Sequence, residues 1–222
     1  MTDTIVFDVD GTLVDTNYHH ALAWFRAFRT CDVTIPVWRI HRAIGMGGDR
    51  LITAVAGERV EDEHGDEIRA AWKRAFQPML GEVMPFEGAR AALEEARRHG
   101  YQVVLASSGD PEHIRHYVDL LAADELAQRV TTAEDVSSTK PDADLLRAAL
   151  DGLDTDTAVL IGDSPWDCVA AAKINLPCVA LRTGGFSVDE LREAGAVLVF
   201  ETLPQLCSAL PNLPMAPVTM AA

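Results

Sequence analysis

Short runs of apolar, β-branched residues alternate along the chain with segments whose apolar residues recur at helical spacing. Five runs are typical of buried strands, and residues 129–135 form a weaker sixth candidate; the five lie at 4–9, 101–108, 157–163, 177–183 and 196–200. They are nearly continuous in apolar residues, as parallel strands covered on both faces are. This alternation of strand and helix predicts an α/β protein with a doubly wound parallel sheet.

The segment 88–100 illustrates the helical pattern between the strands. Ala89, Leu93 and Ala96 recur on one face, and Gly100 is a typical residue just after a helix end. Glu94 lies four residues before an arginine, Arg98, and we expect these two side chains to pair.

The alternation is interrupted once, after the first strand. Residues 16–85 contain helical patterns, clearest at 18–28 and 66–76, and no convincing strand. A stretch this long is unusual for a connection inside a compact domain, so we expect an inserted helical subdomain at 16–85 and a core domain made of 1–15 and 86–210. Residues 211–222 are rich in proline and lack periodicity, and we expect a flexible tail there.

Charge and cysteine content narrow the possible partners. The 222 residues have a formal net charge of −15, which argues against nucleic acid or an anionic membrane as the main partner. The four cysteines are scattered without a CxxC pair, as in a protein with reduced thiols. No apolar run approaches the length of a membrane span. These features predict a soluble, cytoplasmic protein; they do not predict its oligomeric state.

Polar side chains follow the predicted strands at the points where these strands end. In an open parallel sheet, ligands bind beyond the carboxyl ends of the strands, so these side chains are expected to share one edge. The candidates are Asp8 and Asp10 after the first strand, Ser107 and Ser108 after the second, Lys140 after the weaker strand, and Asp163 and Asp167 after the strand at 157–163.

Each of these groups also has a purely structural interpretation. Asp10 precedes a glycine in a common turn signal, and Asp110 can cap a helix that begins at a proline. Ser164 and Asp167 have the spacing of a capping box, and Lys140 can be a solvated surface residue. None of these interpretations explains the position of Asp163.

The chemistry of the whole set favours a functional site. Asp8, Asp10 and Asp163 would repel one another unless a cation lay among them, and a set of oxygen ligands points to Mg²⁺. Lys140 and a serine hydroxyl can neutralise and bind a phosphoryl group. One aspartate can then act as nucleophile, and another can move the proton. The sequence therefore predicts a Mg²⁺-dependent site for phosphoryl transfer.

Four segments resemble the motifs of the haloacid dehalogenase superfamily, in the family's order: "DVDGT" (8–12), "VVLAS" (103–107), "TKP" (139–141) and "GDSPWD" (162–167). The resemblance implies that Asp8 is the nucleophile and Asp10 the general acid and base. It also implies that Ser107, with Ser108 beside it, binds the phosphoryl oxygens and that Lys140 neutralises charge. Mg²⁺ would be held by Asp8, the backbone carbonyl of Asp10 and Asp163, with Asp167 in or near its shell. The helical insertion resembles the family's cap.

Within this family, the aspartate at position 10 limits which reactions the protein can catalyse. The dehalogenases and the phosphonoacetaldehyde hydrolases lack an aspartate two residues after the nucleophile, so Asp10 argues against both reactions. The resemblance implies a phosphatase of small phosphomonoesters, similar to phosphoglycolate phosphatases, whose partner is a small phosphorylated metabolite. A sugar-phosphate mutase similar to β-phosphoglucomutase is the alternative, and a non-catalytic binding protein is a third hypothesis.

Two cap residues are further candidates for substrate binding. "DTNYHHALAW" (15–24) is similar to the start of the mutase cap, in which a histidine at the position of His20 contacts the acid/base region. His20 can equally be a helix residue that packs at the cap joint. "AIGMGGDRL" (43–51) resembles the cap's specificity loop, where Arg50 would contact the substrate's non-reacting end. The alternative is a plain turn between helices with Asp49 as helix cap.

Overall fold

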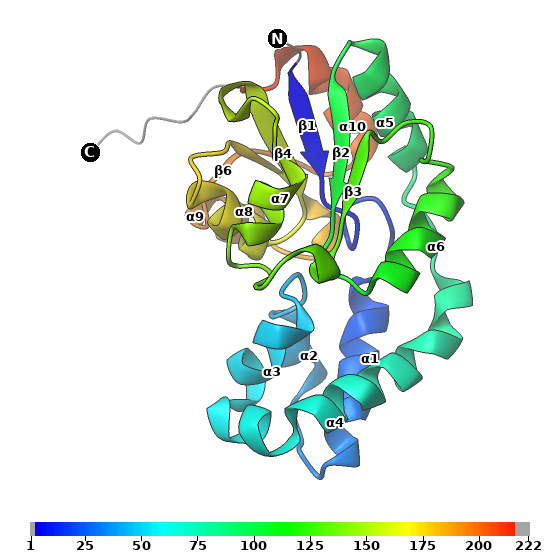
Figure 1. Cartoon of the computed structure of the whole chain (residues 1–222), viewed down its shortest axis with the longest axis vertical. Helices are drawn as coiled ribbons and strands as arrows, with labels where there is room; N and C mark the ends of the chain where they lie inside the picture. Colours follow the sequence, from blue (N-terminus) through cyan, green and yellow to red (C-terminus); the bar gives the residue numbers. More distant parts are fainter. Residues whose placement is uncertain (1–2, 216–222) are drawn as a thin grey trace.

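The computed structural model describes residues 3–215 and contains one parallel sheet (Figure 1). The strand order is β3-β2-β1-β4-β5-β6, so the first strand lies in the middle and pairs with β2 and β4. The strands are β1 (Thr4–Phe7), β2 (Gln102–Ala106), β3 (Arg129–Thr131), β4 (Ala158–Gly162), β5 (Cys178–Leu181) and β6 (Ala196–Phe200). The predicted α/β class and parallel sheet are confirmed.

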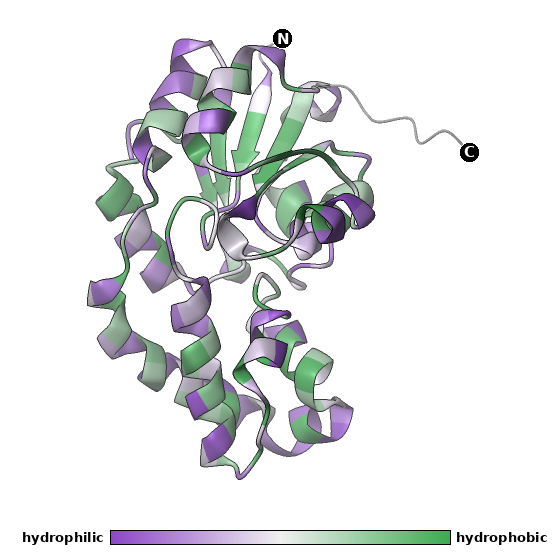
Figure 2. Cartoon of the chain, turned by 180° about the vertical axis from the view of Figure 1, so that it is seen from behind, coloured by the Kyte–Doolittle hydropathy of each residue, from purple (hydrophilic) through white to green (hydrophobic). Residues whose placement is uncertain are grey.

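Helices cover both faces of this sheet. Because side chains alternate between the faces of a strand, Ile5 and Phe7 pack into one apolar cluster and Val6 into another. The first cluster lies under α5 (Ala89–Arg98), α6 (Pro111–Leu121) and α10 (Leu203–Ala209). The second lies under α7 (Asp144–Ala149), α8 (Pro165–Ala172) and α9 (Val188–Glu193). Figure 2 shows the hydrophobic strands inside this cover of mixed helices.

A helical segment is inserted between β1 and β2, as expected. It contains α1 (Asn17–Thr30), α2 (Val37–His41), α3 (Gly48–Ala56), α4 (Glu58–Phe76) and the 3₁₀ helix η1 (Gln77–Glu82). This cap has its own apolar core, which includes Phe28 and Ile68. Figure 1 shows the cap on the side toward which the β1 arrow points, which is the carboxyl edge of the sheet.

The two connections between core and cap lie side by side. Val14 forms a bridge with Pro85, and the amide of Asp15 donates to the carbonyl of Met84 at 2.9 Å. The outgoing and returning chains therefore form a short paired neck. Shorter 3₁₀ helices occur in the loops at η2 (Ala133–Asp135), η3 (Thr155–Thr157), η4 (Arg182–Gly184) and η5 (Leu210–Asn212).

Three details differ from the sequence-based expectations. The edge strand β6 is only partly buried, because it has a neighbour on one side alone. Glu94 pairs with Arg90 at 2.8 Å, so the expected pair with Arg98 was wrong; Arg98 contacts Glu95 instead. The expected tail lies outside the described residues from 216 onward, but before that point Leu213 is buried against the core. Among residues 3–215, no helix has both the length and the apolar character needed to cross a membrane.

Candidate active site

The loop after β1 carries the two aspartates of the first motif into different surroundings. The amide of Asp8 continues the sheet by donating to the carbonyl of Ile161 at 2.9 Å, and its carboxylate is buried. Gly11 has a φ of +77°, a left-handed conformation that glycine adopts without strain, and the chain turns there. The carboxylates of Asp8 and Asp10, both before this turn, have different partners.

Asp8 belongs to a buried cluster of carboxylates. One oxygen from each of Asp8, Asp163 and Asp167 lies within 4.8 Å of the others. Lys140 contacts Asp8 and, at 2.6 Å, Asp167, and its side chain is only 2% exposed. The loops after β1, β3 and β4 thus bring together the predicted metal ligands and the predicted lysine.

Two further side chains hold this cluster in place. The hydroxyl of Thr12 lies 3.0 Å from Asp8 Oδ2 and 2.9 Å from Asp163 Oδ1, within hydrogen-bonding distance of both. The amide of Asn17, the first residue of α1, donates to Asp163 Oδ2 at 2.9 Å. The first residue of the cap's first helix is therefore hydrogen-bonded directly to the carboxylate cluster.

The charges of the cluster are not balanced by the protein alone. Burial raises the pKa of Asp8 well above its usual value, although Lys140 opposes this shift. Burial and the neighbouring Asp167 raise the pKa of Asp163 to about 7. Burial acts to lower the pKa of Lys140, but Asp167 and Asp8 outweigh it and raise that pKa.

This donor set fits a divalent cation. The three clustered carboxylates and the one lysine leave an excess of negative charge, which burial makes costly. All the clustered donors are carboxylate oxygens, the type of ligand that Mg²⁺ prefers. The residues present therefore match a hard metal ion, and a bound cation would relieve the repulsion that raises the pKa of Asp163.

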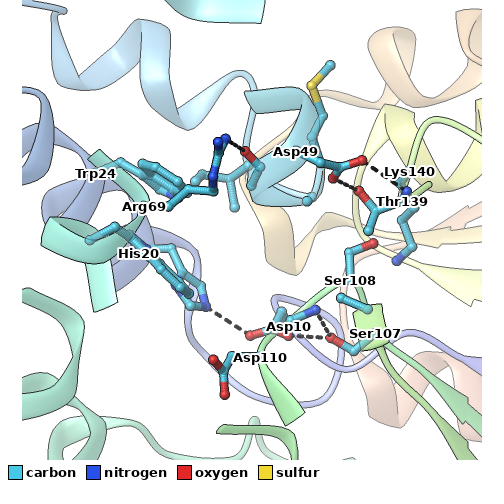
Figure 3. A pocket seen from close by; sticks show the side chains of 18 of the residues that line it. Asp10, His20, Trp24, Asp49, Arg69, Ser107, Ser108, Asp110, Thr139 and Lys140 are labelled. Atoms are coloured by element: carbon cyan, nitrogen blue, oxygen red, sulfur yellow. Dashed lines mark hydrogen bonds and ion pairs between the residues drawn. The ribbon is translucent and has the colours of Figure 1, made fainter. Parts of the chain in front are cut away.

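The carboxylate of Asp10 has different partners from that of Asp8. It accepts a hydrogen bond from Ser107 Oγ at 2.7 Å and lies 3.0 Å from His20 Nε2 (Figure 3). Burial acts to raise the pKa of Asp10, but the hydrogen bond and charge of His20, followed by the bond from Ser107, lower it overall. Asp10 is thus held between the core and the cap.

Both interpretations of His20 describe its position. The imidazole contacts the acid/base candidate Asp10, and it also stacks on Phe76 with 4.1 Å between ring centroids. Trp72 stacks on the other side chains of this group, with 5.6 Å between the ring centroids of Trp72 and His20. His20 therefore connects the cap joint with Asp10.

In the loop after β2, the two serines lie at the candidate site, whereas the following aspartate caps a helix. Ser107 Oγ accepts from the amide of Gly109 at 2.9 Å while it donates to Asp10. Ser108 Oγ has no hydrogen-bond partner among the described residues, and Ser108 lines the cavity between cap and core. Asp110 caps α6 by accepting from the amide of Glu112 at 2.9 Å, as its structural interpretation predicts.

Asp167 serves two purposes. It completes a capping box with Ser164 at the start of α8, where the Ser164 amide donates to Asp167 Oδ2 at 3.1 Å. Its other oxygen, Oδ1, lies beside Lys140. The capping interpretation and the cluster interpretation are therefore compatible for this residue.

The glycine-rich cap segment lines the cavity with residues 44–49 and also contacts the core. Arg50 contacts Asp142 and lies 3.4 Å from Ser138 Oγ, and it is absent from the lining of the cavity. The N-cap of α3 is Gly47, so the alternative in which Asp49 caps this helix was wrong. The Asp49 carboxylate instead accepts from the amide of Thr139, at 3.3 Å, and from its hydroxyl.

A cavity of about 580 Å³ lies between cap and core. Asp8, Asp10 and Lys140 lie in its wall, together with cap residues that the sequence analysis did not single out: Trp24, Met46, Arg69, Trp72 and Lys73. Arg69, Trp72 and Lys73 have the spacing of neighbours on one helix face, which was a signal available in the segment 66–76. The roles of Thr12 and Asn17 were also missed, although Thr12 is the last residue of the first motif and Asn17 lies five residues after it.

A comparison with protein-family models identifies a family. The model described as haloacid dehalogenase-like hydrolase matches residues 2–175. Among curated relatives, the validoxylamine A 7'-phosphate phosphatase of Streptomyces hygroscopicus subsp. limoneus is 26% identical, over 89% of this chain and 93% of that protein. The phosphoglycolate phosphatase of Rhodospirillum rubrum is also 26% identical, over 93% and 90%.

Solved structures show the same architecture. A hydrolase from Pseudomonas syringae superposes with a TM-score of 0.89 at 31% identity, covering 96% of this chain and 99% of that one. A β-phosphoglucomutase from Clostridium difficile superposes with a TM-score of 0.79 at 17% identity, covering 93% of both chains. The second likeness is one of fold.

Proposed function

This chain belongs to the haloacid dehalogenase-like hydrolases, and from that premise we propose that it is a Mg²⁺-dependent phosphatase of small phosphomonoesters. The observation that carries the proposal is the different surroundings of the two motif aspartates. Asp8 lies beside Lys140 in the buried cluster, whereas Asp10 lies between Ser107 and His20. This difference supports a division of roles in which Asp8 reacts with phosphorus and Asp10 exchanges protons.

In the first step, a carboxylate oxygen of Asp8 attacks the phosphorus and the bond to the ester oxygen breaks. The leaving oxygen takes a proton from Asp10 and departs as an alcohol. In the free protein the hydrogen bond from His20 holds the pKa of Asp10 low. An arriving phosphate dianion raises that pKa, as nearby negative charge does, and thereby favours the acid form of Asp10.

In the second step, water attacks the phosphorus of the aspartyl phosphate. Asp10, now a carboxylate, takes one proton from this water, and the bond between phosphorus and Asp8 breaks. Phosphate leaves, Asp8 is again a carboxylate, and Asp10 again carries its proton. Lys140 neutralises Asp8 between turnovers, and the hydroxyls of Ser107 and Ser108 bind the phosphoryl oxygens.

The groups that would hold the metal are Asp8, Asp163, Asp167 and the backbone carbonyl of Asp10. When bound, Mg²⁺ supplies positive charge that stabilises the negative phosphoryl oxygens. Thr12 and Asn17 orient the carboxylates for this purpose, since each donates to the cluster.

The size of the cavity bears on the substrate. Cavities of roughly 300–1,000 Å³ hold drug-sized ligands, and the 580 Å³ here exceed what a two-carbon acid such as phosphoglycolate requires. Trp24, Met46 and Trp72 give it an apolar wall. We therefore expect higher kcat/KM for ring-sized phosphate esters than for phosphoglycolate, as measured with a panel of phosphorylated metabolites.

Hydrolysis of a generic aryl phosphate tests the proposed chemistry. We expect release of phosphate with Mg²⁺, loss of activity to background with EDTA, and the same loss in Asp8→Asn. Asp119→Asn, an exposed residue of α6, is the matched control and is expected to keep full activity. Metal-independent turnover, or full activity of Asp8→Asn, would refute the proposal.

A sugar-phosphate mutase is the second candidate, and the contact between His20 and Asp10 is the observation that favours it. A mutase would convert β-glucose 1-phosphate into the 6-phosphate faster than it releases phosphate. Following both products in one assay separates the candidates, because hydrolysis without isomerisation excludes the mutase.

A further inference from the structure

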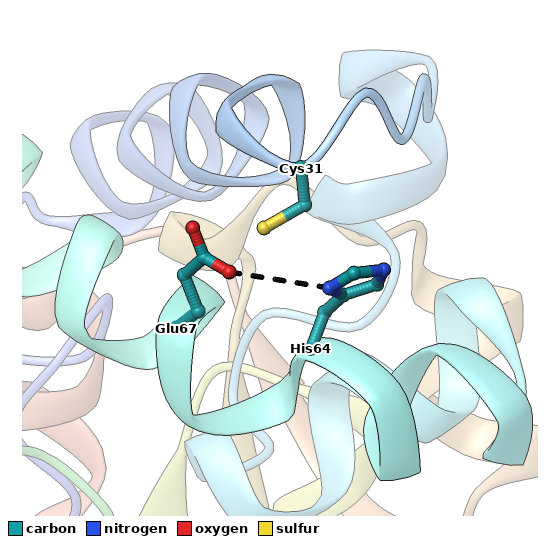
Figure 4. A group of neighbouring side chains, drawn as sticks. All are labelled: Cys31, His64 and Glu67. Atoms are coloured by element: carbon teal, nitrogen blue, oxygen red, sulfur yellow. Dashed lines mark ion pairs between the residues drawn. The ribbon is translucent and has the colours of Figure 1, made fainter.

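A second group of possible metal ligands lies in the cap, away from the carboxylate cluster. One donor atom from each of Cys31, His64 and Glu67 lies within 4.8 Å of the others, and His64 Nδ1 is 4.0 Å from Glu67 Oε2. Figure 4 shows the sulfur, the imidazole and the carboxylate facing one another. Cys31 and His20 lie at opposite ends of α1, about 16 Å apart at 1.5 Å per residue.

Two helices fix the positions of these three side chains. Cys31 is the C-cap residue of α1. His64 and Glu67 are three residues apart on α4, and residues at this spacing lie on the same helix face. The two helices pack on each other through the apolar core of the cap, which contains Phe28 and Ile68. The donor atoms are therefore held together by the fold of the cap.

The mixture of donors differs from that of the carboxylate cluster. A thiolate and an imidazole select borderline or soft metals such as zinc, whereas Mg²⁺ prefers oxygen ligands. Bond lengths of about 2.3 Å to sulfur and 2.1 Å to nitrogen place two ligand atoms of a tetrahedral zinc ion about 3.3–3.8 Å apart. The side chains of His64 and Glu67 are 37% and 62% exposed, so small rotations can close the set and leave a fourth position for water.

We propose that Cys31, His64 and Glu67 form a zinc-type metal site that joins α1 to α4 at the end of the cap remote from the cavity. Burial and the nearby Glu67 carboxylate raise the pKa of the Cys31 thiol, so it is a poor free nucleophile. A bound cation reverses this effect, because it displaces the thiol proton and pairs with both Glu67 and the thiolate. The role of such a site is to stabilise the cap.

Cobalt(II) is the probe that reports on the sulfur ligand. The reduced full-length protein is first given excess Mg²⁺, which occupies the carboxylate cluster, and is then titrated with Co²⁺. We expect a sulfur-to-cobalt charge-transfer band that saturates at one equivalent and that zinc abolishes. The band should disappear in Cys31→Ser and persist in Cys207→Ser, a half-buried cysteine of α10. No band in the wild-type protein, or an unchanged band in Cys31→Ser, would overturn the proposal.

Thermal unfolding gives a second readout that does not depend on activity. With zinc at about 100 times its Kd, the melting temperature of the wild-type protein should rise by roughly 5–10 °C. His64→Gln, a substitution at a half-exposed position of α4, should lose this shift and keep its metal-free melting temperature. The same zinc-dependent rise in His64→Gln would contradict the site. This variant also serves if Cys31→Ser does not fold.

Discussion

A single hydroxyl group, that of Thr12, lies between two of the buried carboxylates, those of Asp8 and Asp163. Because it lies within hydrogen-bonding distance of both, it fixes the spacing of the two carboxylates. Groups that orient ligands in this way typically change metal affinity or activity by about 10–100-fold when they are removed.

We therefore expect Thr12→Val, which keeps the shape and removes the hydroxyl, to raise the Mg²⁺ concentration for half-maximal activity by about 10–100-fold. A Mg²⁺ titration of aryl phosphate hydrolysis measures this effect. Thr157→Val is the matched control, because the Thr157 hydroxyl has no hydrogen-bond partner in the described part of the chain. Equal titrations for the two variants would contradict this role of Thr12.

For single residues, the sequence predicts the functional side chains that follow a strand. It predicts far less well the neighbouring side chains that hold them in position. Asp8, Lys140 and Asp163 could be placed together because parallel strands bring their carboxyl ends to one edge. The spacing of Arg69 and Trp72 puts them on one face of α4, but it does not indicate that this face lines the cavity, because that depends on how α4 packs within the cap. Arg50 illustrates the same limit, because it contacts Asp142 of the core.

Two helices begin with the same capping motif, but the motif has a different role in each. Ser164 at α8 and Ser187 at α9 each form a capping box with the acidic residue three positions later. In α8 that residue is Asp167, a member of the carboxylate cluster, whereas in α9 it is the half-buried Glu190, which pairs with Arg42 outside the cluster.

Replacing either serine by alanine should lower the free energy of unfolding by about 1 kcal/mol, because one helix amide loses its acceptor. Only Ser164→Ala should also weaken Mg²⁺ binding, by about tenfold, since Asp167 loses the hydrogen bond from the Ser164 hydroxyl. Urea unfolding and a Mg²⁺ titration of activity measure the two effects. A comparable loss of Mg²⁺ affinity in Ser187→Ala would show that the effect is general destabilisation.

The elements themselves were largely predictable. Continuous apolar runs mark strands that helices cover on both faces, and this holds for β1, β2, β4 and β5. It fails for β6, whose run is as apolar as the others although the strand lies at the sheet edge and is only partly buried. Strand order is a property of the whole sheet, and periodicity within one segment contains no information about it.

Across the whole molecule, polar contacts join the cap to the core around the cavity. They include Arg42 with Glu190, Asp49 with Thr139, Arg50 with Asp142, and Lys73 with Asp110 at 2.9 Å. Each contact crosses between the two parts of the chain, so together they determine how the cap sits over the site.

Arg50→Gln tests whether this arginine holds the cap or binds the substrate. We expect kcat/KM to fall by about 2–5-fold, the equivalent of one surface ion pair, and by the same factor for small and large phosphate esters. Arg59→Gln, in an ion pair within α4, is the control and should leave kcat/KM unchanged. A loss confined to the larger esters would instead indicate a contact with the substrate.

The contacts of Asp142 also predict a dependence on pH. A hydrogen bond from Lys173, at 2.7 Å, and the charge of Arg50 lower the pKa of Asp142 below its usual 3.8. The folded protein therefore binds this proton more weakly than the unfolded chain does. The contribution of Asp142 to stability is complete above pH 3.8 and is lost as the pH falls through the lower folded value.

Unfolding measured between pH 7 and pH 3 should thus show a small excess stability of the wild-type protein over Asp142→Asn, below about 1 kcal/mol. The excess should shrink toward the acid end of this range. Asp151→Asn removes an exposed carboxylate that has no ion pair within residues 3–215, and it should match the wild-type protein throughout. A difference for Asp142→Asn that does not change with pH would contradict the assignment.

The paired neck between Val14 and Pro85 affects how a protein of this fold can evolve. The chain leaves and re-enters the core at neighbouring points, so the ends of the inserted segment are already close together. A segment of different length or shape can be exchanged there without altering strand order or the positions of Asp8 and Lys140. The catalytic edge and the part that covers it are therefore separate modules, and a new substrate preference can be acquired by transplanting one of them.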